Sequence, residues 1–354
     1  FQSAQKLQQR MENGIQEMTK GNYVSAKSIF GMLIRDSSSP PIILNAARAD
    51  LGLGLTDSAL RLSLQVLRQN PQNADAYQIR GHCMYLAGDF DKAITVLREA
   101  LRMDPDFEIT KLVLRQCKKV QKAIKEANSA VFHRRFQEAV KAYGEAIATS
   151  DPLPTKAPLY SILFSARAEA HLRLKNYAEA LRDSAKAIYG QDDSEKAWLI
   201  KVKAYHGLGQ HQEALSELEE LMQTWGSGSD AIRKAYHQAD FELRKQRRPD
   251  FYGLLGVSQM ASLLEIKKQY KVKAMQYHPD RWSGNRYTAE QQKEAEENFK
   301  LLGEALEILG DDFTRQLYDE GYDQDKIREH VAAAQQAAHR PGGGHGYHGG
   351  HHHR

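Results

Sequence analysis

A period of 34 residues constrains the fold of this chain more than any other feature of its sequence. Pro71 and Pro105 lie 34 residues apart, and small and apolar residues recur between them at helical spacing on both sides of Gly88-Asp89. This pattern predicts two helices joined by a tight turn. One such pair cannot bury its apolar face alone, so successive pairs must stack into a curved, all-α superhelical solenoid.

The same design recurs before and after this segment. It begins near Leu7 and again at Pro40, and it returns after an unbroken helical stretch over residues 107–133, which is too long for half a repeat. We therefore predict six repeats in two blocks, residues 7–106 and 107–228, with a loop insertion from Pro152 to Pro158. The period and the small residues resemble the tetratricopeptide repeat, in which paired helices approach closely. Three of those small residues are Gly81, Ala93 and Ala100.

Composition places the chain among soluble proteins of two or three domains. It has 354 residues, of which 41% are hydrophobic and 27% charged. No apolar run reaches the roughly 20 residues of a membrane span, and no signal-peptide pattern opens the chain, so we expect no membrane association. The chain begins at Phe1 rather than at a methionine, which leaves its native start and targeting open. Its two cysteines, Cys83 and Cys117, predict a reducing compartment, either cytoplasm or nucleus.

A basic stretch ends at the tripeptide His278-Pro279-Asp280. Residues 245–281 contain eight Lys or Arg and three Asp or Glu, a local charge of +5 within a net charge of +4 for the whole chain. Pro279 must end the preceding helix, so His278 and Asp280 are expected on an exposed, stiff turn. Apolar residues at helical spacing from Tyr252 to Leu309 predict two antiparallel helices, and we expect a polar loop from Arg281 to about Thr288 to follow the tripeptide.

Residues 250–321 resemble a J domain in three motifs that occur in order. These are the opening Phe251 to Val257, the tripeptide, and the closing Arg315 to Asp319. Together with the repeats, they resemble the tetratricopeptide-repeat J-domain co-chaperones. The resemblance implies a protein that is not an enzyme, needs no cofactor, binds client proteins, and stimulates ATP hydrolysis by a DnaK-type heat-shock chaperone. The implied docking residues are Lys267, Lys268, Tyr270, Lys271, His278, Pro279 and Asp280, with Lys273 and Arg281 as additional contacts.

One position departs from the J-domain pattern. The family commonly has adjacent Lys and Arg in the middle of the basic helix, whereas Val272 follows Lys271 here. This departure keeps an alternative open, in which the chain is a repeat scaffold with a degenerate J domain that stimulates no ATPase.

Repeats of this family often grip the C-terminal carboxylates of chaperones, including the ninety-kilodalton heat-shock chaperone. Asn128 and Lys196 occupy such positions in the second block, and Asn45 does so in the first. The expected Lys, Asn and Arg are replaced by Ile124, Ala166 and Ile200, which removes most charge-assisted hydrogen bonds. We therefore expect weak tail binding, with scaffolding as the main role of the repeats.

The remaining segments limit the classes of function that the chain can have. Residues 229–249 predict a charged linker helix, and residues 322–354 predict a helix followed by a disordered Gly/His-rich tail with His345, His348 and His351 to His353. We expect no metal site in that tail. Nucleic-acid binding by the basic stretch lacks the interleaved aromatic residues that such sites use, so we expect none. No phosphate loop, metal spacing or nucleophile and base pattern suggests an enzyme.

Overall fold

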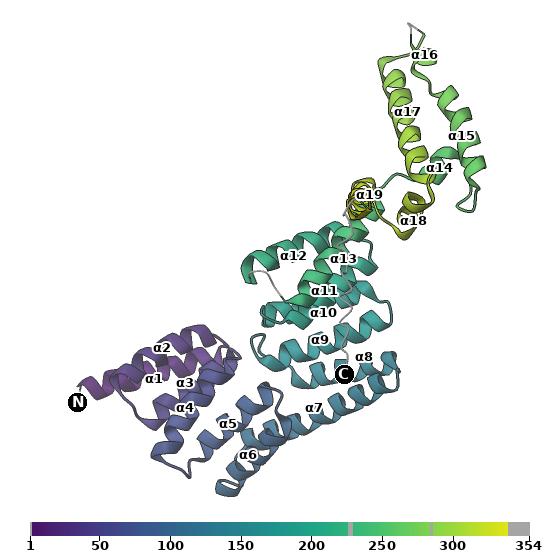
Figure 1. The fold of residues 1–354 in the computed structure, drawn as a ribbon. Coiled ribbons are helices and arrows are strands. Elements are labelled where there is room, and N and C mark those ends of the chain that lie inside the picture. Colours follow the sequence, from purple (N-terminus) through teal and green to yellow (C-terminus); the bar gives the residue numbers. More distant parts are fainter. Residues whose placement is uncertain (1, 226–228, 284–285, 339–354) are drawn as a thin grey trace, which may run out of the picture. The chain divides into compact units, whose positions relative to one another are not determined.

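The computed structural model describes residues 2–225, 229–283 and 286–338. Throughout these ranges the chain forms helices and no β-strand, which confirms the predicted all-α fold. The chain divides into two compact units, one up to residue 236 and one from residue 237 (Figure 1). None of the helices in the described ranges has the length and apolar character needed to cross a bilayer.

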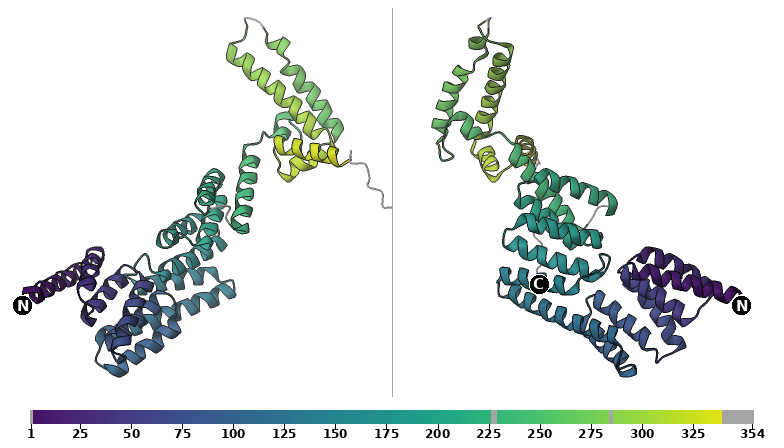
Figure 2. Two further views of the ribbon diagram at one scale, coloured as in Figure 1. Left: turned by 60° about the vertical axis from the view of Figure 1, so that its left-hand side comes forward. Right: turned by 180° about the vertical axis from the view of Figure 1, so that it is seen from behind.

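The first unit stacks consecutive helices in pairs, as the period predicts (Figures 1 and 2). In chain order its helices are α1 (Gln2–Thr19), α2 (Tyr23–Asp36), α3 (Pro40–Gly52), α4 (Thr56–Gln69), α5 (Ala74–Leu86), α6 (Phe90–Met103), α7 (Glu108–Phe132), α8 (Phe136–Ser150), α9 (Pro158–Arg173), α10 (Tyr177–Gly190), α11 (Glu195–Gly207), α12 (His211–Trp225) and the beginning of α13 (Asp230–Arg247).

Glycine allows both the turn and the close approach within a pair. Gly88 joins α5 to α6 with a positive φ of 85°, a conformation that side chains rarely adopt. A Cβ on Gly81 would lie 2.6 Å from the Cγ of Leu97, so only glycine lets these helices approach as they do. Ala93 and Ala100 are fully buried on α6. Small residues in the repeat therefore set the distance between paired helices.

The single helix α7 joins the two blocks of repeats. It is 25 residues long, as the unbroken helical pattern predicts, and it buries apolar residues along its whole length. One continuous apolar core runs from Ile43 in the first block, past Val113 and Ala127 on α7, to Ala170 in the second. The two blocks are therefore one solenoid with a shared core.

The insertion before α9 packs closely against the first block. Ala157 is 1% exposed, and a Cβ on Gly54 would lie 2.4 Å from its backbone nitrogen. Nearby, the Tyr85 hydroxyl donates a hydrogen bond to Ser150 Oγ at 3.1 Å. The proline-rich loop found in the sequence thus helps to join the blocks, a role that its composition does not predict.

The second unit contains the end of α13 and six further helices around a separate core. These are α14 (Phe251–Leu255), α15 (Leu263–Gln276), α16 (Pro279–Trp282), α17 (Ala289–Leu309), α18 (Asp312–Glu320) and α19 (Gln324–Ala338). The core contains Phe251, Tyr252, Leu255, Ile266, Leu302, Ala305 and Leu309 from α14, α15 and α17, together with Leu317, Tyr318 and Ile327.

The end of α13 is attached to the base of this unit. Arg244 bonds Asp240 on its own helix at 3.0 Å and Asp323, just before α19, at 3.2 Å. The Phe241 ring meets the Tyr322 ring edge-on, with centroids 5.5 Å apart. Because Ile327 of α19 is 2% exposed in the same core, residues on both sides of α14 to α18 belong to the folded unit.

Candidate functional site

Two capped helices hold the His278-Pro279-Asp280 turn at one end of the second unit (Figure 1). Ser262 and Glu265 form a reciprocal capping box at the start of α15, and Thr288 and Gln291 form another at the start of α17. Each box satisfies backbone N–H groups that a helix start leaves without partners. Both long helices therefore have well-defined beginnings, and α16 lies between them.

Within the turn, His278 and Asp280 lie on the surface. His278 has extended backbone geometry and accepts a hydrogen bond on Nδ1 from the Asp280 N–H, at 3.3 Å. Its ring also meets Phe299 of α17 edge-on, with centroids 5.6 Å apart. The side chains of His278 and Asp280 are 48% and 89% exposed. The Asp280 N–H and the Phe299 ring thus fix the orientation of the His278 imidazole, while the Asp280 carboxylate stays accessible to a partner.

The two residues after the tripeptide cap the end of α15. Arg281 Nη1 donates to the Met275 carbonyl at 3.0 Å, and Trp282 Nε1 donates to the Gln276 carbonyl at 2.8 Å. Carbonyls in the last turn of a helix lack helical partners, so these bonds satisfy groups that Pro279 leaves open. The expectation of a loop from Arg281 is therefore wrong at its start, because Arg281 and Trp282 belong to α16.

Aromatic stacking also stiffens the turn that contains His278-Pro279-Asp280. The Trp282 ring stacks on Tyr277, with centroids 6.5 Å apart and planes within 9°, and it packs against Tyr287 at 4.7 Å. The sequence pattern did not identify Trp282 as important. An indole donor directly after a proline-terminated helix is the signal that identifies it.

The basic face of α15 is exposed, and Glu265 of the capping box is a carboxylate near it. Lys267, Lys268 and Lys271 are exposed, and none forms an ion pair within the described part of the chain. Tyr270 is half-buried and packs against the core of the second unit. Lys267 and Lys271 are one turn apart, so their fields add on one side of the helix. The predicted lysines therefore lie together on the surface, and Tyr270 anchors the helix beneath them.

An apolar row lies beside these lysines. Leu264, Val272 and Met275 of α15 are all exposed, with Val272 at 54%. Their spacing places them in line with Lys268 on the helix surface. Val272, which departs from the family pattern, thus presents an apolar patch where a second cation is common.

The opposite end of the second unit is closed by tyrosine hydrogen bonds. The Tyr318 hydroxyl donates to the Pro249 carbonyl at 2.8 Å and accepts from the Phe251 N–H at 3.1 Å. The Tyr252 hydroxyl donates to Asp319 at 2.8 Å and accepts from Arg315 at 3.0 Å. Burial raises the pKa of both tyrosines, which keeps the two hydroxyls protonated. The opening and closing motifs are therefore structural and fix the ends of the helix pair.

In the repeats, Lys196 lines a groove between α9 and α11. The groove has a volume of about 640 Å³ and includes Arg173, Tyr177 and Lys203. The Lys196 ammonium pairs with Glu169 at 2.8 Å across this groove. An entering carboxylate would have to displace Glu169 from Lys196.

In the other two predicted carboxylate contacts, the side-chain oxygen has a partner within the chain. Asn128 of α7 is exposed, and its side-chain oxygen accepts a hydrogen bond from the Tyr143 hydroxyl at 2.7 Å. Asn45 of α3 is 9% exposed, and its oxygen accepts from Arg48 at 3.0 Å. Ile200 is buried, which agrees with its lack of any donor for a ligand. The structure thus places the three residues on three different helices, α3, α7 and α11.

A stacked helical solenoid, together with a helix pair that presents His-Pro-Asp, defines the class of repeat proteins with a J domain. Comparison with known families supports this class: the DnaJ domain family matches residues 250–319, and a tetratricopeptide repeat family matches residues 44–106 and 124–196. The chain belongs to the proteins that combine tetratricopeptide repeats with a DnaJ domain. This membership agrees with the prediction of a protein that is not itself an enzyme.

Several curated relatives are similar to this chain over about three quarters of its length. A DnaJ homolog subfamily C member 7 homolog from Schizosaccharomyces pombe is 35% identical over 267 residues, which are 75% of this chain and 54% of the relative. The human DnaJ homolog subfamily C member 7 is 34% identical over 276 residues, 77% of this chain and 54% of the relative. The chain thus spans about half the length of these relatives.

A solved structure shares the fold. The crystal structure of the P58(IPK) TPR domain aligns with a TM-score of 0.53 at 17% sequence identity, covering 95% of this chain and 100% of that one. At this level of identity the likeness concerns the fold alone. It supports the predicted helical solenoid.

Proposed function

We propose that the second unit stimulates ATP hydrolysis by a DnaK-type chaperone. The observation that carries this proposal is the exposed His278-Pro279-Asp280 turn beside a lysine face whose members form no ion pair within the described residues. Such a face attracts an acidic surface over distances of several ångströms and orients it before contact. His278, Pro279 and Asp280 then provide short-range contacts on a turn that is already ordered, so little entropy is lost on docking.

The proposed docking residues are those that the J-domain resemblance implies. We place Lys267, Lys268 and Lys271 in long-range attraction, and we place Tyr270 beneath them as a support. Arg281 holds the turn through the Met275 carbonyl, so its effect on docking is indirect. The J domain itself, over residues 250–321, is extended by the end of α13 and by α19.

The repeats, in this proposal, hold client or chaperone proteins. Residues 7–106 and 107–228 form the two blocks, and residues 229–249 connect them to the J domain. Acidic chaperone tails, including those of the ninety-kilodalton chaperone, are expected to bind weakly because Lys196 is already paired with Glu169.

Burial raises the pKa of the Cys83 and Cys117 thiols to about 12, so both stay protonated and unreactive near neutral pH. Two such thiols suit a reducing compartment, and we place the protein in the cytoplasm or nucleus.

Single-turnover ATP hydrolysis tests the proposal. A purified DnaK-type chaperone loaded with ATP is measured alone and with a tenfold excess of the full chain. We expect the hydrolysis rate to rise at least about tenfold, because J-domain docking lowers the barrier by more than about 1.4 kcal/mol. An unchanged rate would select the alternative, a repeat scaffold whose J domain is degenerate.

A further inference from the structure

A continuous row of cations runs along one side of α7, outside the groove that contains Lys196. Five basic residues recur at intervals of four and three, which places them on one face of the helix: Lys111, Arg115, Lys118, Lys122 and Lys125. At about 1.5 Å per residue the row is about 21 Å long. A helix face needs no such charge for packing, because α7 buries the opposite side in the core.

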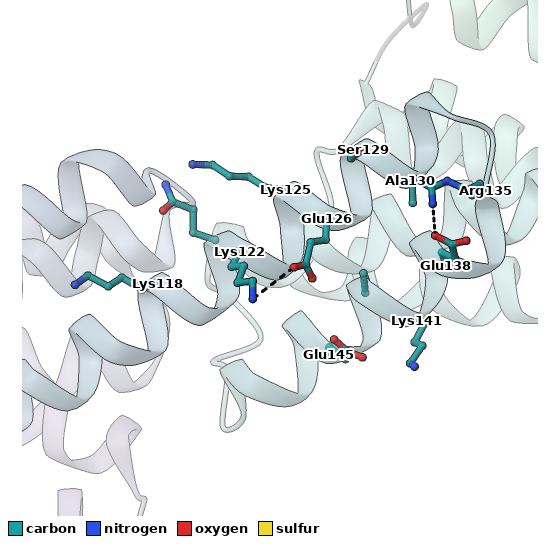
Figure 3. A pocket seen from close by; sticks show the side chains of 12 residues that line it. Lys118, Lys122, Lys125, Glu126, Ser129, Ala130, Arg135, Glu138, Lys141 and Glu145 are labelled. Atoms are coloured by element: carbon teal, nitrogen blue, oxygen red, sulfur yellow. Dashed lines mark ion pairs between the residues drawn. The ribbon is translucent and has the colours of Figure 1, made fainter.

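The last three of these lysines border a groove between α7 and α8. Its volume is about 770 Å³, and small residues such as Ser129, Ala130 and Ala142 line it between the longer side chains. Figure 3 shows Lys118, Lys122 and Lys125 along α7 and Lys141 on α8. The groove is therefore large enough for an extended segment of a polypeptide and is bordered by ammonium groups.

Intrachain pairing leaves this groove with an excess of positive charge. Lys122 pairs with Glu126 at 3.7 Å, and Arg135 pairs with Glu138 at 2.9 Å, both at the surface. Lys118, Lys125 and Lys141 form no ion pair within the described residues, and Glu145 is the one lining carboxylate there without a cation partner. Exposed ion pairs contribute less than about 1 kcal/mol each, so the paired cations can exchange partners readily.

The lining chemistry favours an acidic polypeptide over a nucleic acid. Three carboxylates, Glu126, Glu138 and Glu145, share the groove and would repel a phosphate backbone, whose charge is uniform. The lining contains no aromatic side chain on which bases could stack. A polypeptide can direct its carboxylates towards α7 and its backbone N–H groups towards the glutamates of α8. We propose that this groove binds an acidic segment of a partner protein, at a site separate from both α15 and the Lys196 groove.

Fluorescence anisotropy with the full chain tests this inference. The probe is a labelled twelve-residue peptide of alternating Glu and Ala, compared with a peptide in which Gln replaces each Glu. The triple variant Lys118→Gln, Lys122→Gln, Lys125→Gln should bind the Glu peptide at least about tenfold more weakly, since three charge-assisted contacts are lost. The control Lys234→Gln, Lys293→Gln, Lys300→Gln removes the same charge from exposed positions outside both basic faces and should stay within about twofold of the wild type.

A second variant separates shape from charge. Ser129→Trp fills part of the groove without changing the charge, and it should also weaken binding of the Glu peptide about tenfold or more. The inference is overturned if the wild type does not distinguish the Glu from the Gln peptide, or if the control triple loses as much affinity as the α7 triple. It is also overturned if a twelve-nucleotide single strand binds more tightly than the Glu peptide and loses that affinity in the α7 triple.

Discussion

The lysine face of α15 and the groove of Lys196 show that a basic residue alone does not indicate a binding site. On α15, none of the lysines Lys267, Lys268 and Lys271 forms an ion pair within the described residues. In the groove of the repeats, Lys196 pairs with Glu169. A free ammonium group gains a full new interaction when an acidic partner arrives, whereas a paired one only exchanges partners.

The neighbourhood of Lys196 extends this contrast. Lys201 pairs with Glu217 at 2.6 Å, and Arg167 forms two hydrogen bonds to the buried Asp183, at 2.7 and 2.8 Å. The second block thus uses several of its cations to hold its own helices together. The lysines Lys267, Lys268 and Lys271 of α15 instead face the surroundings, which is the physical basis for assigning the two regions different roles.

The largest expected effect concerns the turn beside the free lysines. His278→Gln should abolish ATPase stimulation, and Asp280→Asn should do the same, while helix content by circular dichroism stays unchanged. Both side chains are exposed and contribute little to the core, so the fold should not depend on them. Asp312→Asn, an exposed first-turn carboxylate on α18, is the matched control and should retain stimulation. Stimulation that survives His278→Gln would remove this turn from the docking site.

Long-range attraction gives the next effect. The double variant Lys267→Gln, Lys271→Gln should slow association with the chaperone about tenfold at low salt, and less as the screening length falls from about 10 Å at 0.1 M towards 3 Å at 1 M. Stopped-flow association rates at several salt concentrations measure this. Lys293→Gln, Lys300→Gln on α17 removes the same charge and should change the rate less than twofold. Equal slowing in both variants would mean that only net charge matters.

Val272 allows a smaller, opposite change. Val272→Arg adds a cation to the face and should raise the association rate about threefold at low salt and not at 1 M. Val272→Gln is the control, because it removes the apolar surface without adding charge. A rate that falls in both variants would show instead that the partner contacts the apolar row of Leu264, Val272 and Met275.

The smallest effect is expected in the repeats. Lys196→Ala should change the affinity for a peptide ending in two acidic residues less than about threefold, because an exposed ion pair typically contributes only about 0.5 kcal/mol. Titration calorimetry on the full chain measures this, with the C-terminally amidated peptide as the control. Micromolar binding that is lost in Lys196→Ala would show that a paired lysine can also bind an acidic partner, and it would identify an intact carboxylate site.

Much of this fold follows from sequence periodicity. The 34-residue period, Gly81 and Gly88 require paired helices with close approach, and the unbroken pattern of residues 107–133 requires one long helix. Local rules also determine the start of α15, because Ser262 and Glu265 form a capping box within four consecutive residues. Such features depend on neighbours in the chain, which is why they can be predicted without a structure. The predicted Gly/His tail lies outside the described residues.

Contacts between distant residues could not be predicted in this way. The pairing of Lys196 with Glu169 joins two helices, and the contact of Ala157 with Gly54 joins two blocks. Val272 shows the limit most clearly, because its sequence position indicates only a missing cation, while its exposure depends on how α15 packs against α17.

By itself, then, the sequence determined the helices, their pairing and the place of the His278-Pro279-Asp280 turn. These depend on backbone restriction by proline and glycine and on apolar periodicity, which act over a few residues. Tertiary structure alone decided that Lys196 is neutralised, because its partner Glu169 lies on another helix. The reason is that an ion pair requires two side chains to meet within about 4 Å, and residues far apart in sequence meet only when the helices have packed.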